Sequence, residues 1–306
     1  MALIKNILIT GGSGYLAGRL GEYLSKNKFN VRLVSRKKNL LTKNSSKINW
    51  NNNKSIKNNF KNIQCIVHAA GPNYRECHKN YKTSKKFYDA TTKKIIKIAN
   101  ECKINKIIFF SSTMVYDQKS NCITEKSKKY SDSSYAKLNL IAEKHILNHM
   151  PEAKIKRIVV RLSNAVGVPL HKKIDCWELL CNEICKTLIT KNKIVLKTNG
   201  QQKKNFIAIS EISQKIMYLI KSNKNKLIIN LISNKSFKVI EMATFIKLIY
   251  EKKYKKKGGL EIGKDIDEKN YPEIKSIFKF QCAKNTRQQL KNEITNTLIF
   301  CKKIFK

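Results

Sequence analysis

Three glycines near the beginning of the chain, Gly11, Gly12 and Gly14, have the composition and spacing of a phosphate-binding turn. Gly11 can adopt a backbone φ that a side chain would forbid, and Gly14 lets the backbone approach a pyrophosphate closely. The N–H groups that open the next helix face such an anion with the positive end of the helix dipole. This pattern predicts a dinucleotide bound through its diphosphate. The alternative is a tight strand-to-helix connection without a ligand.

The hydrophobic pattern predicts a strand before this turn and a helix after it. Residues 3–10 form an apolar run of the length of a buried parallel strand, and apolar residues then recur at helical spacing, namely Leu16, Leu20, Tyr23 and Leu24. Ala17 stands where the third glycine of a G-x-G-x-x-G pattern often stands. We therefore expect cofactor binding by the turn and the first helical residues, namely Gly11, Ser13, Gly14, Tyr15 and Leu16.

The end of the second predicted strand, residues 30–36, indicates which dinucleotide is preferred. A dinucleotide fold places there the residue that meets the adenosine ribose, typically an acid when the 2′-hydroxyl is free. This chain has Ser35, Arg36 and Lys37 instead. A hydroxyl and a guanidinium would hold a 2′-phosphate that an acid would repel, so we expect NADP(H) to be favoured over NAD(H).

Another buried-strand pattern runs from Ile63 to Gly71 and ends in small residues. Small side chains at the carboxyl end of a strand leave room for a cofactor against the sheet, which predicts binding by Ala69, Ala70 and Gly71. His68 lies within the apolar run, so we interpret it as a packed core histidine rather than as an acid or base.

Strands and helices alternate through the first half of the chain. We expect strands at 106–116 and 155–162, helices at 76–102 and from the serine-rich stretch 131–135 to Ile146, and a loop at 163–169. This alternation predicts an α/β fold built on a doubly wound parallel sheet.

The composition is that of a folded and very basic chain. Of its 306 residues, 42% are hydrophobic, which is enough for a core, and the formal net charge is +42. Such a charge is typical of proteins that bind nucleic acids or anionic surfaces. Only seven of the 63 basic residues are arginines, however, and the lysines are spread from end to end. A nucleic-acid interface would concentrate charge and use arginine for bidentate contacts, so we expect no specific nucleic-acid partner.

The nine cysteines form no C-x-x-C pair, and their number is odd. Cys181 and Cys185 are four residues apart on a predicted helix, but no nearby histidine or third cysteine completes a zinc set, so we predict no metal site. The first strand begins without a signal-peptide pattern, and no apolar run reaches the length of a membrane span. We expect reduced thiols, no membrane insertion and a cytoplasmic protein.

Five motifs together resemble the extended short-chain dehydrogenases/reductases, specifically the NAD-dependent epimerase/dehydratase group that acts on nucleotide sugars. They read TGGSGYLA, HAAG, SSTMVY, SYAK and RLSNAVG, and begin at Thr10, His68, Ser111, Ser134 and Arg161. They keep the family's order and spacing over residues 3–169. The segment 199–212 is similar to the family's G-x-x-x-R-D-F-x-x-V-x-D segment, with Lys204 for the arginine. The resemblance implies a Rossmann-type sheet with a smaller C-terminal substrate-binding lobe.

The resemblance also implies catalytic residues. In the family a Ser or Thr, a Tyr and a Lys four residues later move a proton to or from the substrate while a nicotinamide exchanges a hydride. By position, Ser112 matches the hydroxyl and Tyr135 matches the acid or base. The alternatives are a strand-end hydroxyl that bonds its own backbone and an aromatic ring that packs at a helix start.

Asn139 occupies the place of the family lysine, which is the main departure from the pattern. The lysine charge would lower a tyrosine pKa from about 10 toward neutrality, whereas asparagine can bond the ribose but has no charge. Lys137 cannot replace it, because position i+2 of a helix faces away from Tyr135. Ketone reduction starts from a protonated tyrosine and tolerates this loss better than alcohol oxidation, so we expect a reductase-like or a catalytically impaired member.

The resemblance divides the chain into a dinucleotide-binding domain at 1–169 and a mostly substrate-binding lobe at 170–306. Residues within about 205–232 are expected to complete the sheet, with a helix at 206–221 and a strand at 227–231 that rejoins its edge. Asn164 and Lys204 are expected to bind the substrate near its diphosphate, although a solvated loop is an equal alternative for the lysine. After Val239 we expect a helix, a basic loop and a weakly patterned tail.

We therefore predict an NAD(P)-dependent enzyme that acts on a nucleotide-activated sugar by hydride transfer at a ring carbon, most consistent with keto-sugar reduction, in a homodimer. A catalytically silent dinucleotide-binding protein, serving as a redox-responsive interaction module, is the first alternative, and a polyanion binder is the second. The sequence leaves open the sugar, the nucleotide base, and the choice among epimerisation, dehydration and reduction.

Overall fold

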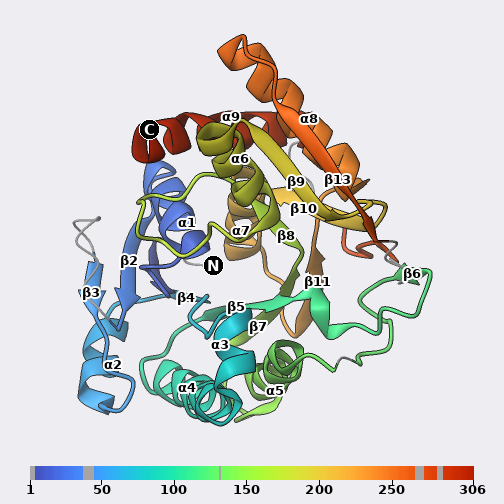
Figure 1. The fold of residues 1–306 in the computed structure, drawn as a ribbon. Helices are drawn as coiled ribbons and strands as arrows, with labels where there is room; N and C mark the ends of the chain where they lie inside the picture. The colour runs from blue at the N-terminus through green and yellow to red at the C-terminus, as the bar shows by residue number, and fades with distance from the viewer. Residues whose placement is uncertain (1–3, 37–44, 131, 266–271, 281–284) are drawn as a thin grey trace.

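A central sheet of seven parallel strands organises the molecule, which a computed structural model describes over residues 4–36, 45–130, 132–265, 272–280 and 285–306. The strands lie in the order β11-β7-β5-β4-β1-β2-β3, so the order reverses between β1 and β4 (Figure 1). Their bounds are β1 Asn6–Thr10, β2 Asn30–Ser35, β3 Ser45–Lys47, β4 Cys65–His68, β5 Lys106–Ser112, β7 Lys156–Leu162 and β11 Leu227–Leu231. The predicted doubly wound α/β fold is confirmed. Open sheets of this kind bind ligands outside the carboxyl ends of their strands, at the point of reversal.

Helices cover both faces of this sheet (Figure 1). One face carries α1 (Tyr15–Lys26) and α7 (Ile209–Lys221), and the other carries α3 (Tyr74–Lys79), α4 (Tyr81–Glu101) and α5 (Ser134–Asn148), while α2 (Asn53–Phe60) follows β3. Side chains alternate along a strand, so β1 sends Ile7 and Ile9 into the core under α1 and α7 and sends Leu8 into the opposite core. Burial on both sides explains why the strands are continuous apolar runs in the sequence.

The C-terminal lobe has its own hydrophobic core. A three-stranded sheet, in the order β12-β10-β8, consists of β8 Asn164–Val166, β10 Lys203–Ala208 and β12 Ser236–Lys238. Three helices pack on it, namely α6 Leu180–Lys191, α8 Val239–Tyr254 and α9 Thr286–Phe305. The chain also forms two small sheets: β9 (Lys193–Thr198) pairs with β13 (Gly259–Asp265), and β6 (Cys122–Ile123) pairs with β14 (Glu273–Ile274).

Five sequence-based expectations differ from the structure. The strand expected at 106–116 ends at Ser112, where a short 3-10 helix, η1 (Thr113–Val115), begins. The helix expected from residue 206 begins at Ile209, because residues 206–208 pair with β8 as part of β10. The expected loop at 163–169 contains β8, and the expected helix at 76–102 is divided at Asn80, whose backbone is not helical. The weakly patterned tail contains α9, a helix of 20 residues. Ser131, in the stretch expected to cap α5, lies outside the described residues.

A buried lysine joins the central sheet to α7. Lys106, at the start of β5, is 1% exposed, and its ammonium donates to the backbone carbonyls of Leu219, Ile220 and Ser222 at the end of α7. Arg157 in β7 donates in the same way to carbonyls at the end of α5. Both cations satisfy carbonyls that lack a partner within their helix and lie at the negative end of its dipole.

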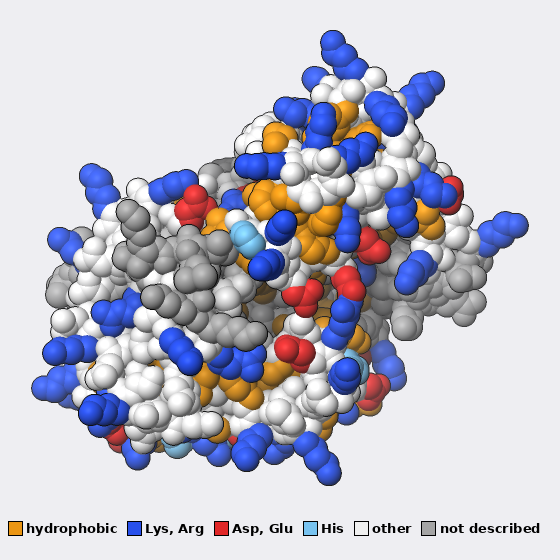
Figure 2. All heavy atoms as spheres, turned by 60° about the vertical axis from the view of Figure 1, so that its left-hand side comes forward, with side chains coloured by type: hydrophobic (Ala, Val, Ile, Leu, Met, Phe, Trp, Pro, Cys, Tyr) orange, Lys and Arg blue, Asp and Glu red, His pale blue; other side chains and the backbone are white. Residues whose placement is uncertain are grey.

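Basic side chains are scattered over the face drawn in Figure 2, with uncharged residues between them. On this face the large net charge forms no single continuous stripe of the kind that tracks a nucleic-acid backbone. None of the helices in the described ranges combines the length and the hydropathy needed to cross a bilayer.

Candidate functional site

The glycine turn is packed tightly between the ends of β1, β2 and β4. The backbone N–H of Gly12 donates to the Val34 carbonyl at 3.0 Å, and that of Gly14 donates to the Gly11 carbonyl at 2.7 Å. Gly11 has a φ of +76°, and a Cβ there would lie 2.9 Å from the Ala69 carbonyl oxygen. A Cβ on Gly14 would meet a single atom within 4 Å, the Gly11 oxygen. The turn therefore requires glycine at position 11, and a Cβ at position 14 would also be crowded, at 3.0 Å from the Gly11 oxygen.

A cavity of about 160 Å³ adjoins this turn at the reversal point of the sheet. Eight of the ten predicted cofactor-binding residues line it, namely Gly11, Ser13, Gly14, Ser35, Arg36, Ala69, Ala70 and Gly71. The other lining residues are Val34, Trp50, Pro72 and Phe87. The guanidinium carbon of Arg36 lies 5.9 Å from the centre of the Phe87 ring, a cation–π contact. Lys37 lies outside the described residues.

Tyr15 and Leu16, the other two predicted cofactor-binding residues, do not line this cavity. The Tyr15 hydroxyl donates to the Gly167 carbonyl at 2.5 Å, and burial raises the pKa of this phenol well above its ordinary value. Leu16 packs against the core beneath α1. Any contact of these two residues with a diphosphate would therefore be made by their backbone N–H groups at the start of α1.

Thr10 and His68 fix the carboxyl end of β4. The Thr10 hydroxyl oxygen accepts the N–H groups of Ala69 and Ala70, both at 3.1 Å, so its own hydrogen is directed to His68 Nδ1 at 2.7 Å. His68 Nδ1 is then an acceptor, which requires a neutral ring. Burial lowers the pKa of His68 from 6.5 to about 3. The interpretation of His68 as a packed core histidine is confirmed, and the pair shapes the Ala69–Ala70 wall of the cavity.

Ser112 ends β5 and Tyr135 lies in the first turn of α5, which places both near the carboxyl edge of the sheet. Ser112 accepts the Met114 N–H at 3.2 Å, and the Tyr135 ring lies 6.1 Å from the Tyr74 ring of α3, between centres. No hydrogen bond joins Ser112 to Tyr135 in the described residues. The two predicted catalytic groups thus share one edge, and a substrate oxygen bound between them would be needed to connect them.

Asn139 lies one turn after Tyr135 and is 1% exposed. Its amide donates to the backbone carbonyl of Tyr135 at 2.9 Å. Burial raises the pKa of Tyr135 above its ordinary value of 10.0, while a hydrogen bond from Asn139 opposes this shift. Lys137 is exposed. The phenol is therefore protonated throughout the neutral pH range.

The two predicted substrate-binding residues lie on adjacent strands of the three-stranded sheet. Asn164 begins β8, is exposed, and donates its amide to the Asn205 carbonyl at 2.9 Å. Phe206 pairs with Asn164 in the parallel register, so Lys204 lies two residues earlier on the neighbouring strand. Lys204 is half-buried in β10, which replaces the solvated loop considered from the sequence.

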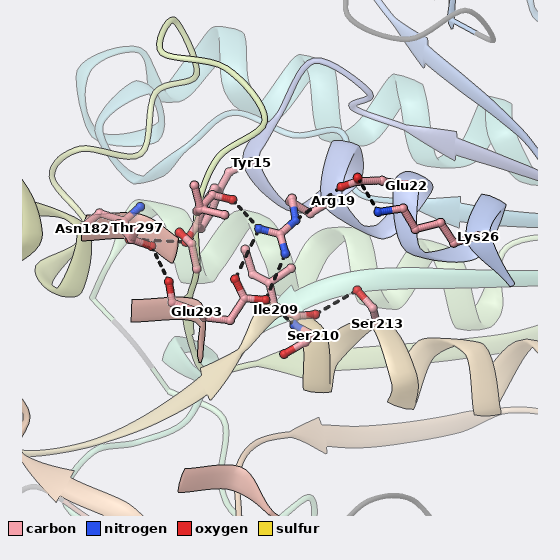
Figure 3. A network of polar contacts seen from close by, with 12 residues as sticks. Tyr15, Arg19, Glu22, Lys26, Asn182, Ile209, Ser210, Ser213, Glu293 and Thr297 are labelled. Atoms are coloured by element: carbon pink, nitrogen blue, oxygen red, sulfur yellow. Dashed lines mark hydrogen bonds and ion pairs between the residues drawn. The ribbon is translucent and has the colours of Figure 1, made fainter. Parts of the chain in front are cut away.

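An ion pair between a half-buried guanidinium and a buried carboxylate connects the helix of the glycine turn to the C-terminal lobe (Figure 3). The Arg19 guanidinium donates to the Glu293 carboxylate at 3.0 and 3.3 Å and to the Val168 carbonyl at 2.7 Å. Glu293 also accepts the Ser210 N–H at the start of α7, at 3.1 Å. No local sequence pattern indicates this pair, because its partners are 274 residues apart.

The eight cysteines in the described part of the chain are free thiols, and Cys282 lies outside it. Within the described ranges, no group of three or more His, Cys, Asp or Glu side chains is arranged to hold a metal ion.

The parallel sheet with its glycine turn places the chain among Rossmann-type α/β proteins. A sequence profile of the NAD dependent epimerase/dehydratase family matches residues 7–231, and the chain belongs to this family. A putative UDP-glucose 4-epimerase of Methanocaldococcus jannaschii is 24% identical over 254 residues, which are 79% of this chain and 81% of that protein.

Solved structures share the whole fold. UDP-N-acetylglucosamine 4-epimerase of Methanobrevibacter ruminantium, with UDP-N-acetylmuramic acid, superposes with a TM-score of 0.81 at 16% identity and 98% coverage of both chains. UDP-glucose 4-epimerase of Thermotoga maritima, with UDP-glucose, gives 0.80 at 14% identity, over 98% of this chain and 100% of the other. UDP-glucuronic acid 4-epimerase of Bacillus cereus, with UDP-glucuronic acid and NAD, gives 0.76 at 16% identity, over 98% and 99%.

Proposed function

We propose that this chain binds NADP(H) and reduces a keto group on the sugar of a nucleotide-activated sugar, with Tyr135 as the proton donor. The protonation state of Tyr135 carries the proposal. Burial keeps the pKa of Tyr135 above its ordinary value, and Asn139 brings no positive charge to lower it. A phenol that is protonated at neutral pH is the correct starting form for reduction, whereas oxidation needs a base.

The cavity beside the glycine turn supports the choice of cofactor. Its walls fit the adenosine side of a dinucleotide, with the backbone of Ser13 and Gly14 toward the diphosphate and Ser35 and Arg36 toward the ribose. When bound, the nicotinamide supplies the hydride. The solved UDP-glucuronic acid 4-epimerase contains NAD, which has no 2′-phosphate. The proposed preference for NADP(H) therefore rests on Arg36 of this chain and not on the relatives.

The proposed step converts a carbonyl to an alcohol. A hydride adds to the carbonyl carbon, and the phenolic proton of Tyr135 moves to the carbonyl oxygen, leaving a phenolate that water reprotonates. The Ser112 hydroxyl accepts the Met114 N–H, so its own hydrogen can be donated to the same oxygen. Asn164 and Lys204 would hold the substrate near its diphosphate, as an amide and an ammonium suit phosphate oxygens.

The test is the oxidation of NADPH, followed by its fluorescence, with 4-keto nucleotide sugars as substrates. We expect Tyr135→Phe to lower kcat by about 10² to 10⁴, because general acid catalysis is lost. Tyr130→Phe is the matched control, since this hydroxyl is exposed and bonds Asp132, and it should leave kcat unchanged. Equal rates for the two variants would refute the role of Tyr135.

Asn139→Lys tests the direction of the reaction. A lysine at this position would lower the pKa of Tyr135, so the loss of the reduction rate at high pH should move to lower pH. A pH–rate profile that does not move in a variant of unchanged melting temperature would contradict the argument.

A silent dinucleotide-binding module is the second candidate. It is favoured by the covered position of Tyr135 beside α3 and by the absence, within the described residues, of a bond between this phenol and Ser112. Tight binding of NADPH without turnover of any keto-sugar nucleotide would support this candidate over the reductase.

The predicted homodimer remains part of the proposal, and light scattering at several protein concentrations measures it.

A further inference from the structure

A groove of about 710 Å³ lies between α8 and α9 in the C-terminal lobe, away from the glycine turn (Figure 1). Its two walls are helices. The α8 wall consists of Phe245, Leu248, Ile249, Lys252 and Lys253, and the α9 wall includes Arg287, Gln288, Lys291 and Thr295. Along each helix these residues recur three or four positions apart, so each wall is a single helical face.

The apolar part of the α8 wall, which we call the floor of the groove, consists of three residues. Phe245, Leu248 and Ile249 have the i, i+3, i+4 spacing of a face that packs on a neighbour, but Leu248 remains 57% exposed. The Arg287 guanidinium lies 5.5 Å from the centre of the Phe245 ring and closes one side of the floor. Ile249 belongs to the core of the lobe and Phe245 is half-buried against it, so the exposed apolar surface of the groove is mainly that of Leu248.

The rim of the groove is cationic from both sides. Lys252 and Lys253 contribute from α8, and Arg287 and Lys291 contribute from α9, while no acidic residue lines the groove. None of the four cations forms an ion pair with an acidic side chain in the described ranges. Elsewhere on α8, by contrast, Lys247 pairs with Glu251 at 3.0 Å.

We propose that this groove binds an acidic amphipathic helix of a partner protein. Carboxylates one turn apart on such a helix would face Arg287 and Lys291, which are four residues apart, and its apolar side chains would cover Leu248. A second copy of this chain that faced the groove with the same surface is disfavoured, because it would bring the same four rim cations together. A flat membrane would reach the rim cations and Leu248 but would leave the space between the two helices unfilled, whereas a helix would occupy it.

The experiment measures binding of the full chain to a fluorescent helical peptide of about 16 residues, with leucines along one face and glutamates one turn apart beside them. A peptide of the same composition, scrambled so that no face collects both residue types, is the matched probe. Vesicles containing phosphatidylserine are the third probe. Circular dichroism and melting temperature report folding, and enzymatic activity is not used, so the outcome is independent of the proposed reaction.

Two groove variants and one control decide the result. Leu248→Asp removes the exposed apolar contact, and Lys252→Glu with Lys291→Glu reverses one charge on each wall; each should weaken peptide binding by about tenfold or more. Lys128→Glu with Lys129→Glu makes the same charge change at exposed positions outside the groove and should change affinity less than about twofold. Equal binding of the scrambled peptide, or undiminished binding by the folded groove variants, would overturn the proposal. Vesicle binding that Leu248→Asp abolishes, without peptide binding, would overturn it in favour of a membrane.

Discussion

Acidification should destabilise this protein through one buried side chain, His68. The ring is 1% exposed in β4, and burial lowers its pKa from 6.5 to about 3. In the unfolded chain the ring regains its ordinary pKa, so between about pH 6.5 and about pH 3 the unfolded state binds a proton that the folded state does not. The stabilising contribution of neutral His68 is therefore complete above about pH 6.5 and declines as the pH falls toward 3.

The size of the effect follows from the two pKa values. At about pH 4.5, the pH lies about two units below the pKa of the unfolded ring, while the folded ring is still neutral, so the loss of stability relative to neutral pH is about 2.7 kcal/mol. This is a large part of the stability of an ordinary domain, which is about 5 to 15 kcal/mol. Carboxylates titrate in the same range, so the histidine contribution must be isolated by comparison with a variant.

His68→Asn provides this comparison, because an amide oxygen can accept the Thr10 hydroxyl but takes up no proton in this range. Urea unfolding at about pH 7 and about pH 4.5 should show the natural protein losing about 2 to 3 kcal/mol more than His68→Asn. His78→Asn, a substitution at an exposed histidine, should keep the pH dependence of the natural protein. The same pH dependence in the natural protein and His68→Asn would refute the reasoning.

Three further predictions concern packing, and urea unfolding measures each of them. Glu293→Gln removes the closer of the two carboxylates beside the Arg19 guanidinium, the other being Glu22 at 3.8 Å, and should cost about 2 to 4 kcal/mol. Glu101→Gln, at an exposed pair with Lys57 that does not involve Arg19, should cost clearly less. Lys106→Met removes the donor to three carbonyls at the end of α7 and should cost about 2 to 4 kcal/mol, and a change below 0.5 kcal/mol would contradict that role. Gly11→Ala places a side chain on a residue with positive φ, so it should lower the free energy of unfolding by about 1 to 3 kcal/mol and weaken NADPH binding. Unchanged affinity for NADPH would contradict a role of the turn in binding the cofactor.

Much of the nucleotide half could be predicted because its signals are local. Strands buried on both faces are continuous apolar runs, and the turn after β1 requires glycine, so the central strands and the residues from Gly11 to Gly14 follow from short stretches of sequence. The topology then brings the ends of β2 and β4 to the same cavity, which is why Arg36 and Gly71 line it as expected.

The missed features depend on contacts between distant segments. Trp50 and Phe87 line the cavity although neither belongs to a motif, and Arg19 meets Glu293 only when the two ends of the chain fold together. In contrast, α9 had a signal that was not used: Leu290, Ile294 and Leu298 are spaced four residues apart and are fully buried. The start of α7 was misplaced because residues 206–208 have an apolar composition that suits a helix or a strand, and only pairing with β8 decides between them.

The three carbonyls that receive Lys106 also have a consequence for synthesis on the ribosome. β5 leaves the exit tunnel long before α7 has been translated, so the ammonium of Lys106 must stay hydrated until the end of α7 arrives. The nascent half that contains β5 therefore lacks the carbonyl partners of this ammonium until the end of α7 is released. We expect a chain truncated at residue 169 to unfold at a lower urea concentration than the full chain, because it lacks these partners and the edge strand β11.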